Sequence, residues 1–216
     1  MSFFNFNKNP DRALRQHPLL KGKKLIGRGL MSGVFDCDDE CVYVVTCDRA
    51  KYLFYQELCD GKHAFFPKVL EDHGSIARDV KLLRVERLEK RIRRASGQGE
   101  ICIRQGRGQG VETQACRTPQ DWVRLLNWVA DYTEHDGGKL RRTEPWAYQA
   151  GVLRVAAWMG QSEPHHQALI ALSDFIGDAR CTLDLQPSNF MYRGAALVFN
   201  DPVSHMGGDM DLFAGW

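Results

Sequence analysis

The chain has 216 residues, of which 44% are hydrophobic and 26% are charged, and its formal net charge is +2. This composition is ordinary for a globular protein, and the small net charge gives no global argument for a nucleic-acid or membrane partner. No stretch approaches the roughly 20 consecutive apolar residues that a membrane-spanning helix needs, so no membrane partner is expected.

A glycine-rich stretch at 25–35 follows an N-terminal arm at 1–20. It has the pattern of a strand, a turn and a second strand, with Gly27 and Gly29 near the turn. Glycines let backbone N–H groups approach a phosphate without a Cβ in the way. The stretch therefore predicts a turn that covers a phosphate, or a plain hairpin with flexible glycines.

The next segment is a β-branched run at 41–46, which is typical of a buried strand. A helix is expected after it, from 48 to 59, with Asp48 as its N-cap. Lys51 and Glu57 lie on this helix. Such residues usually face solvent, and the alternative is that they contact a charged ligand.

Two further strands are predicted at 65–70 and 80–88, joined by a turn at His73–Gly74. The segment 89–110 is then rich in arginine and glycine. A basic, glycine-rich insertion could bind nucleic acid or an acidic protein, or it could be a solvated loop.

The seven cysteines do not form a recognisable zinc motif. No C-x-x-C pair occurs, and Cys37, Cys41 and Cys47 have no histidine nearby in the sequence. Zinc is therefore not expected, and reduced thiols in a cytosolic protein are the simpler interpretation.

Three helices are predicted in the second half of the chain. The first begins at Thr118, with a proline and an acid in its first turn, the second spans 146–159, and the third runs from Pro164 to about Gly177. Their apolar stripes indicate core faces. His165 and His166 start the third helix and are expected on the surface.

The most informative stretch carries Asp184, Asn189 and Asp201, with a predicted hairpin at 190–199 between the last two. Magnesium prefers hard oxygen ligands, including one or two carboxylates, and shares other positions with water and phosphate. The spacing therefore favours a magnesium–phosphate site, although a hairpin with incidental polar turn residues would have the same pattern.

The segment 183–204 resembles the catalytic loop and metal-binding segment of protein kinases, in which D-L-x-P-x-N precedes a hairpin that ends in an Asp. The sequence Asp184–Asn189 fits that pattern, and Asp201-Pro202-Val203 stands where the family has D-F-G. The segment is most similar to the small early serine/threonine protein kinases of autographiviruses, where an Asp-Pro-Val-Ser ending also occurs. The glycine stretch similarly resembles the kinase G-x-G-x-x-G-x-V loop.

This resemblance implies an α+β fold, namely a compact two-lobe protein-kinase-like fold with a truncated C-terminal lobe. The implied domains are an arm at 1–20, a small β-rich lobe at 21–92, and a helical lobe at 93–216, with the basic insertion at 89–110. The implied cofactors are ATP and Mg²⁺, the implied partner is a host protein, and the implied location is the cytoplasm of an infected bacterial host.

Site residues follow from the resemblance, position by position. It implies catalytic roles for Asp184, Lys51 and Glu57, of which Lys51 is a surrogate cation, and it implies that Asn189 and Asp201 hold magnesium. Nucleotide contacts are implied for residues of the glycine stretch and one residue of the catalytic loop: Gly27, Arg28, Gly29, Ser32, Val34 and Gln186.

The sequence departs from the kinase pattern at positions that normally carry positive charge. The strand lysine is missing, because residues 44–46 are Val, Val and Thr, and Gln186 replaces the usual catalytic-loop lysine. Three functions therefore stay open. They are a phage protein kinase, a pseudokinase that binds and inhibits a host protein, and a small-molecule phosphotransferase.

Overall fold

The computed structural model describes residues 12–77, 79–90, 102–104, 113–115, 118, 120–121, 123–127, 130, 144–158, 163–184, 186–194 and 196–204. These residues have an α+β fold and divide into two compact units. The first unit holds 12–60 and 67–87, and the second holds 61–66 and 88–204. Among the described helices, none has the length and apolar character needed to cross a bilayer.

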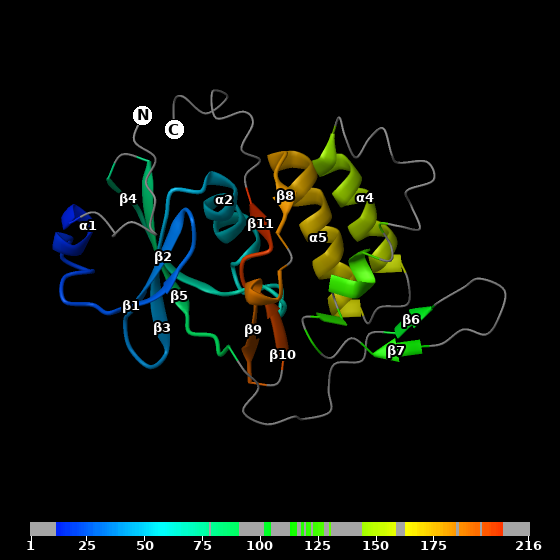
Figure 1. The fold of residues 1–216 in the computed structure, drawn as a ribbon, viewed down its shortest axis with the longest axis horizontal. Helices are drawn as coiled ribbons and strands as arrows, with labels where there is room; N and C mark the ends of the chain where they lie inside the picture. Colours follow the sequence, from blue (N-terminus) through cyan, green and yellow to red (C-terminus); the bar gives the residue numbers. More distant parts are fainter. Residues whose placement is uncertain are drawn as a thin grey trace. The chain divides into compact units, whose positions relative to one another are not determined.

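The first unit is built on one antiparallel sheet of five strands in the order β1-β2-β3-β5-β4 (Figure 1). Helix α2 (Arg49–Leu58) connects the third strand to the fourth, and a short helix α1 (Arg12–Gln16) precedes the first. The strands are β1 (Leu25–Arg28), β2 (Ser32–Asp36), β3 (Cys41–Thr46), β4 (Val69–Ala77) and β5 (Val80–Glu86).

The two faces of this sheet carry different helices. On one face, Leu14 and Leu20 from the α1 region pack on alternate residues of three strands. On the other face, α2 covers the sheet, and Tyr52 of α2 lies under the Lys81 ammonium at 5.1 Å. The core on the α1 side consists of Leu14, Leu20, Phe35, Tyr43, Val45, Val80 and Leu82.

Helix α2 begins where the sequence predicted. Asp48 is its N-cap, and the carboxylate Oδ1 accepts a hydrogen bond from Lys51 N at 3.2 Å. This bond satisfies one of the backbone N–H groups that the first turn of a helix leaves without a partner.

The predicted turn at His73–Gly74 is wrong. Strand β4 continues through these residues to Ala77, and Asp79 lies in a turn just before β5. Gly74 has a positive φ of 68°, and the pairing register shifts between Asp72 and Gly74. The glycine therefore forms an irregularity within the strand instead of ending it. The predicted strand at 65–70 is also wrong over most of its length, because β4 starts only at Val69.

The second unit contains a helix pair, α4 (Pro145–Trp158) and α5 (Glu163–Ala179), close to the predicted bounds. A buried Ser173 joins them by donating a hydrogen bond to Ala150 O at 2.9 Å. Helical residues at 120–121, 123–127 and 130 follow Thr118, whose hydroxyl accepts a bond from Asp121 N at 3.3 Å. A short strand pair, β6 (Cys102–Arg104) and β7 (Thr113–Ala115), precedes all of these helical residues in the chain.

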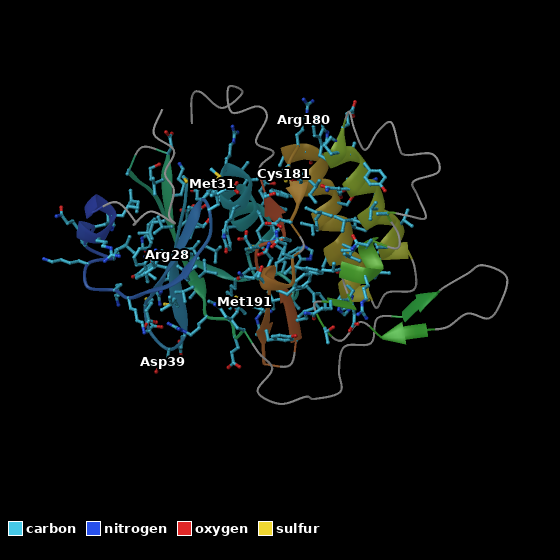
Figure 2. All side chains as sticks on the ribbon, in the orientation of Figure 1. Arg28, Met31, Asp39, Arg180, Cys181 and Met191 are labelled. Atoms are coloured by element: carbon cyan, nitrogen blue, oxygen red, sulfur yellow. The ribbon has the colours of Figure 1, made fainter. Side chains whose placement is uncertain are left out.

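Helix α5 ends at Ala179, Arg180 turns the chain with a φ of 49°, and the buried Cys181 follows (Figure 2). The remaining elements are short, and they include the hairpin that the sequence predicted after Asn189. They are β8 (Thr182–Leu183), the 3-10 turn η2 (Pro187–Asn189), β9 (Phe190–Arg193), β10 (Ala196–Phe199) and β11 (Val203–Ser204).

Candidate functional site

The acidic loop of the second unit is closed at its base by a short strand pair. Strand β8 pairs with β11 so that Leu183 is opposite Val203. One step further along, Asp184 N donates a hydrogen bond to Pro202 O at 2.8 Å. The pairing therefore brings Asp184 next to the Asp201–Pro202 segment.

Asn189 lies at the centre of this loop. Its side-chain Nδ2 donates to Asp184 O at 2.6 Å, and its backbone carbonyl accepts from Asn200 N at 2.9 Å and from Asp201 N at 3.2 Å. Asn189 thus bonds both to Asp184, which precedes the hairpin, and to Asn200 and Asp201, which follow it. The structure brings together the three residues for which the sequence predicted a magnesium–phosphate site.

The donor set of the loop fits a magnesium ion. Because Nδ2 of Asn189 is bonded to Asp184 O, the amide is oriented and its Oδ1 becomes the oxygen that can face a ligand. Asp184, Asn189 and Asp201 are each half-buried, so their oxygens are partly accessible. The Asp201 carboxylate and the Asn189 amide oxygen are ligands of the hard type that Mg²⁺ prefers, and their partial exposure leaves space for its waters.

Residue Gln186 is exposed and precedes η2, where its carbonyl accepts a bond from Asn189 N at 2.8 Å. It therefore contributes its backbone to the loop. Sequence reasoning missed Gln149 of α4, whose side-chain Oε1 accepts a bond from Leu183 N at 2.8 Å. No local sequence signal marks such a contact, because it joins residues that are 34 positions apart.

The hairpin is anchored to the segment 61–66 of the same unit. Phe199 N donates to Phe65 O at 2.8 Å, and the Phe199 ring lies between those of Phe66 and Phe190, with centroids 6.4 and 5.1 Å away. Arg193 donates to Phe66 O at 2.9 Å and also to Ala64 O. These contacts fix strand β10 and, through it, the start of the Asp201 segment.

The predicted phosphate-covering turn belongs to the first unit. Gly29 N donates to Ser32 O at 2.8 Å, which closes the turn between β1 and β2. A Cβ on Gly27 would lie 3.3 Å from Val34 Cβ, so this glycine permits the close approach of the two strands. Arg28 is exposed on β1. The turn is thus a tight hairpin, and the close approach of its strands explains why residue 27 is a glycine.

The place of the missing strand lysine is filled by uncharged groups. Val44 and Val45 are buried, and the fully buried Thr46 shares a hydrogen bond of 3.0 Å with the Ser32 hydroxyl. The Thr46 hydroxyl also accepts a bond from Asp48 N at 3.0 Å. Three candidate positions for a cation therefore carry none, and the hydroxyl pair joins the glycine turn to the start of α2.

Lys51 and Glu57 have opposite environments on α2. Lys51 is buried, with an exposed fraction of 6%, whereas Glu57 near the end of the helix is exposed. The solvent-facing alternative is therefore wrong for Lys51 and correct for Glu57. A buried ammonium is costly without compensation, so Lys51 is the more informative of the two residues for a role as surrogate cation.

A basic hollow of about 550 Å³ lies at the edge strand β1 of the first unit. Phe35, on the α1 side of the sheet, lines it together with Gly27. By strand alternation the Ser32 and Thr46 hydroxyls belong to the other face, so this hollow and the hydroxyl pair are separate features. Its cationic lining consists of Arg15, Lys23, Lys24 and Arg28.

Comparison with known proteins gives no relative. No protein-family model matches the chain, and no curated protein matches it significantly.

The basic insertion at 89–110 lies mostly outside the described residues, so its binding to nucleic acid stays a prediction.

His165 differs from its predicted surface position. It is half-buried, and its ring lies 3.7 Å from the Phe65 ring, centroid to centroid. Burial lowers the pKa of His165 from 6.5 to about 4, because the charged form would lose hydration. The ring is therefore neutral at neutral pH.

This burial predicts a pH-dependent stability for the second unit. Between pH 6.5 and about 4 the unfolded chain binds a proton at His165 that the folded chain does not, so stability should fall as the pH falls through this window. Thermal unfolding of His165→Phe should show a weaker fall than the wild type. Equal pH profiles for wild type and His165→Phe would contradict the prediction.

Proposed function

We propose that this chain is an ATP- and magnesium-dependent phosphotransferase of the protein-kinase type, which transfers the γ-phosphoryl group of ATP to Ser or Thr hydroxyls of host proteins during phage takeover of a bacterium. The observation that carries the proposal is the bonding of Asn189. Its side-chain amide donates to Asp184 O, and its backbone carbonyl accepts from Asp201 N. One residue thereby holds two carboxylate-bearing residues in a single compact loop.

The topology of each unit supports the proposal. In the first unit a helix follows the third strand of a small antiparallel sheet, which is the position of the helix that carries a conserved glutamate in kinases. In the second unit a helix pair precedes the acidic loop, and the hairpin of β9 and β10 separates Asn189 from Asp201. Both features are expected of a kinase-like fold with two lobes.

The roles of the acidic residues follow from their chemistry. Asp184 would accept or orient the proton of the attacking hydroxyl, and Asn189 Oδ1 and the Asp201 carboxylate would hold magnesium. When bound, magnesium would neutralise negative charge on the phosphate oxygens. In the glycine turn, Gly27, Arg28 and Gly29 would contact phosphate.

A second function is favoured by the hydroxyl pair of Ser32 and Thr46. Thr46 of this buried pair occupies one of the candidate positions of the kinase strand lysine. Gln186 replaces a second kinase lysine, that of the catalytic loop. A pseudokinase that binds and inhibits a host protein would need neither charge. Under the first proposal Lys51, and after it Arg28, replaces the missing cation. A small-molecule phosphotransferase would differ from both only in its acceptor.

Magnesium-dependent nucleotide binding is the first test of the proposal. ATP at ~100 times its dissociation constant should add about 2.7 kcal/mol of stability. At roughly 2–4 °C per kcal/mol for a chain of this size, the melting temperature should rise by about 5–10 °C. The rise should require Mg²⁺ or Mn²⁺ and vanish in Asp201→Asn, because that change removes the charge that faces the metal.

A label-transfer assay, read together with the thermal shift, separates the three candidate functions. Labelled ATP with bacterial lysate should give labelled protein if the chain is a protein kinase, and labelled small molecules if the acceptor is small. A metal-dependent shift without any transfer would favour the pseudokinase. A shift that persists in EDTA, or that Asp201→Asn leaves unchanged, would show that the acidic loop is not the metal site.

A further inference from the structure

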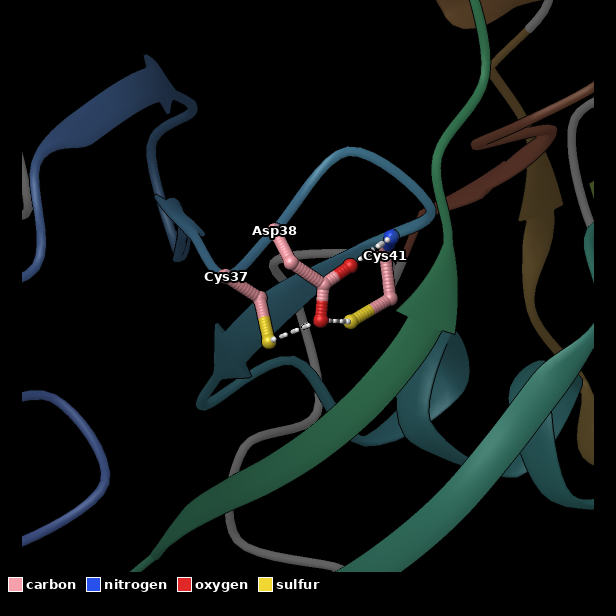
Figure 3. A group of neighbouring side chains, drawn as sticks. All are labelled: Cys37, Asp38 and Cys41. Carbon is pink, nitrogen blue, oxygen red and sulfur yellow. Dashed lines mark hydrogen bonds between the residues drawn. The ribbon is translucent and has the colours of Figure 1, made fainter.

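The end of the β2–β3 hairpin in the first unit carries two cysteines and one aspartate that face one another (Figure 3). The register pairs Asp36 with Val42, so Cys37 and Cys41 are the next residues facing each other, on either side of the loop that contains Asp38. Asp38 Oδ2 lies 3.5 Å from Cys37 Sγ and 3.2 Å from Cys41 Sγ. All the potential ligand atoms lie within 4.8 Å of one another.

These distances are close to those of a tetrahedral zinc site. Bonds of ~2.3 Å to sulfur and ~2.1 Å to oxygen, at tetrahedral angles, place S and O about 3.6 Å apart and two S atoms about 3.8 Å apart. The observed S···O distances of 3.5 and 3.2 Å require only small adjustments. Cys37 is half-buried and Asp38 is exposed, so water can reach the fourth position.

The surroundings hold the three groups in orientation. The second carboxylate oxygen, Asp38 Oδ1, accepts hydrogen bonds of 2.9 Å from both Glu40 N and Cys41 N. This arrangement fixes the carboxylate in the way that outer-shell hydrogen bonds fix metal ligands, and it leaves Oδ2 directed at the sulfurs. Arg84 Nε donates to Cys41 Sγ at 3.2 Å.

The charge of the cluster suits a divalent cation. Two thiolates and one carboxylate carry three negative charges, a divalent ion leaves one, and the Arg84 guanidinium, which also lies 3.9 Å from Glu71 Oε2, partly offsets it. Without metal, Cys41 Sγ donates a hydrogen bond to Asp38 Oδ2 at 3.2 Å. Metal binding replaces such thiol protons and releases them to solvent.

We propose that Cys37, Asp38 and Cys41 form a binding site for a thiophilic divalent cation of the zinc class, with water as the fourth ligand. The site would link the two sides of the connecting loop of the hairpin, and Arg84 of β5 contacts it through Cys41 Sγ. It uses thiolate ligands and lies in the first unit, so it is chemically different from the oxygen site proposed for magnesium and does not depend on that proposal.

The test uses the full chain, purified in a non-thiol reductant and freed of metal. Titration with Zn²⁺ should show one tight equivalent, and Co²⁺ should give thiolate charge-transfer absorption with tetrahedral d–d bands. Cys37→Ser should abolish this absorption. Arg84→Gln, which removes only an outer partner, should weaken zinc binding by about 10–100-fold. Cys47→Ser is the matched control, because Cys47 Sγ instead donates to Met31 O, and it should bind like the wild type.

Two outcomes would overturn the proposal. One is the lack of thiolate–cobalt absorption in the reduced wild type, which would mean that the thiols do not bind the ion. The other is unchanged zinc stoichiometry and affinity in Cys37→Ser. Cys37 is the decisive position because it is half-buried and its change to Ser is mild, whereas Cys41 is fully buried and its replacement could also disturb folding.

Discussion

Replacing Asp184 by Asn should lower phosphoryl transfer by about 10²–10⁴-fold, the usual contribution of a positioned general base. The variant should lose turnover but remain folded, because the bonds that Asp184 makes within the loop come from its backbone and not from its side chain. Its N–H donates to Pro202 O, and its C=O accepts from the Asn189 amide. An amide side chain keeps both bonds but no longer accepts a proton at neutral pH.

The measurement is the rate of label transfer from ATP at saturating nucleotide, together with the magnesium-dependent thermal shift. Asp184→Asn should keep the shift, since in the proposed site the charge that faces the metal belongs to Asp201. Asp178→Asn, an exposed aspartate on α5, is the matched control and should leave both readouts unchanged. Full activity in Asp184→Asn would exclude this residue as the catalytic base.

Replacing Phe199 by Ala should destabilise the second unit by about 3–5 kcal/mol, the range for removing a buried aromatic ring. Only 3% of Phe199 is exposed, and its ring contacts those of Phe66 and Phe190. At roughly 2–4 °C per kcal/mol the melting temperature should fall by about 6–20 °C. Since Phe199 precedes Asp201 by two positions, magnesium-dependent binding should weaken as well.

Met191 provides the comparison for this change. It lies on the neighbouring strand β9 and is only half-buried (Figure 2). Met191→Ala should therefore lower the free energy of unfolding clearly less than Phe199→Ala does. Calorimetry or denaturant unfolding of both variants checks the prediction. Equal costs would mean that the hairpin is not anchored through the ring of Phe199.

The elements that sequence analysis predicted well are those with local causes. Helix α2 begins at Asp48 because a side-chain cap is a short-range signal, and the hairpin after Asn189 follows from two apolar runs and the turn between them. The approach of Asp184 to Asn189 was expected for the same reason. The acidic loop could therefore be located before any coordinates were known.

The failures have long-range causes. Gly74 indicates a turn or an irregularity equally well, and only its pairing with β5 decides between them. His165 becomes half-buried because Phe65 packs against it from a distant part of the sequence. The proximity of Cys37 and Cys41 to one aspartate was likewise not visible in the sequence, because the register of a hairpin brings these residues together.

The anchoring of 61–66 on the hairpin also determines when the second unit can be completed during synthesis. Arg193 bonds to a carbonyl 129 positions earlier in the chain. At 5–20 residues per second, the early segment waits roughly 6–26 s for these partners. The next residues of the chain, 67–87, carry the last two strands of the five-stranded sheet and are synthesised long before Arg193. The segment 61–66 is therefore synthesised well before the hairpin residues that bind it, and the anchored hairpin can form only after those residues have been made.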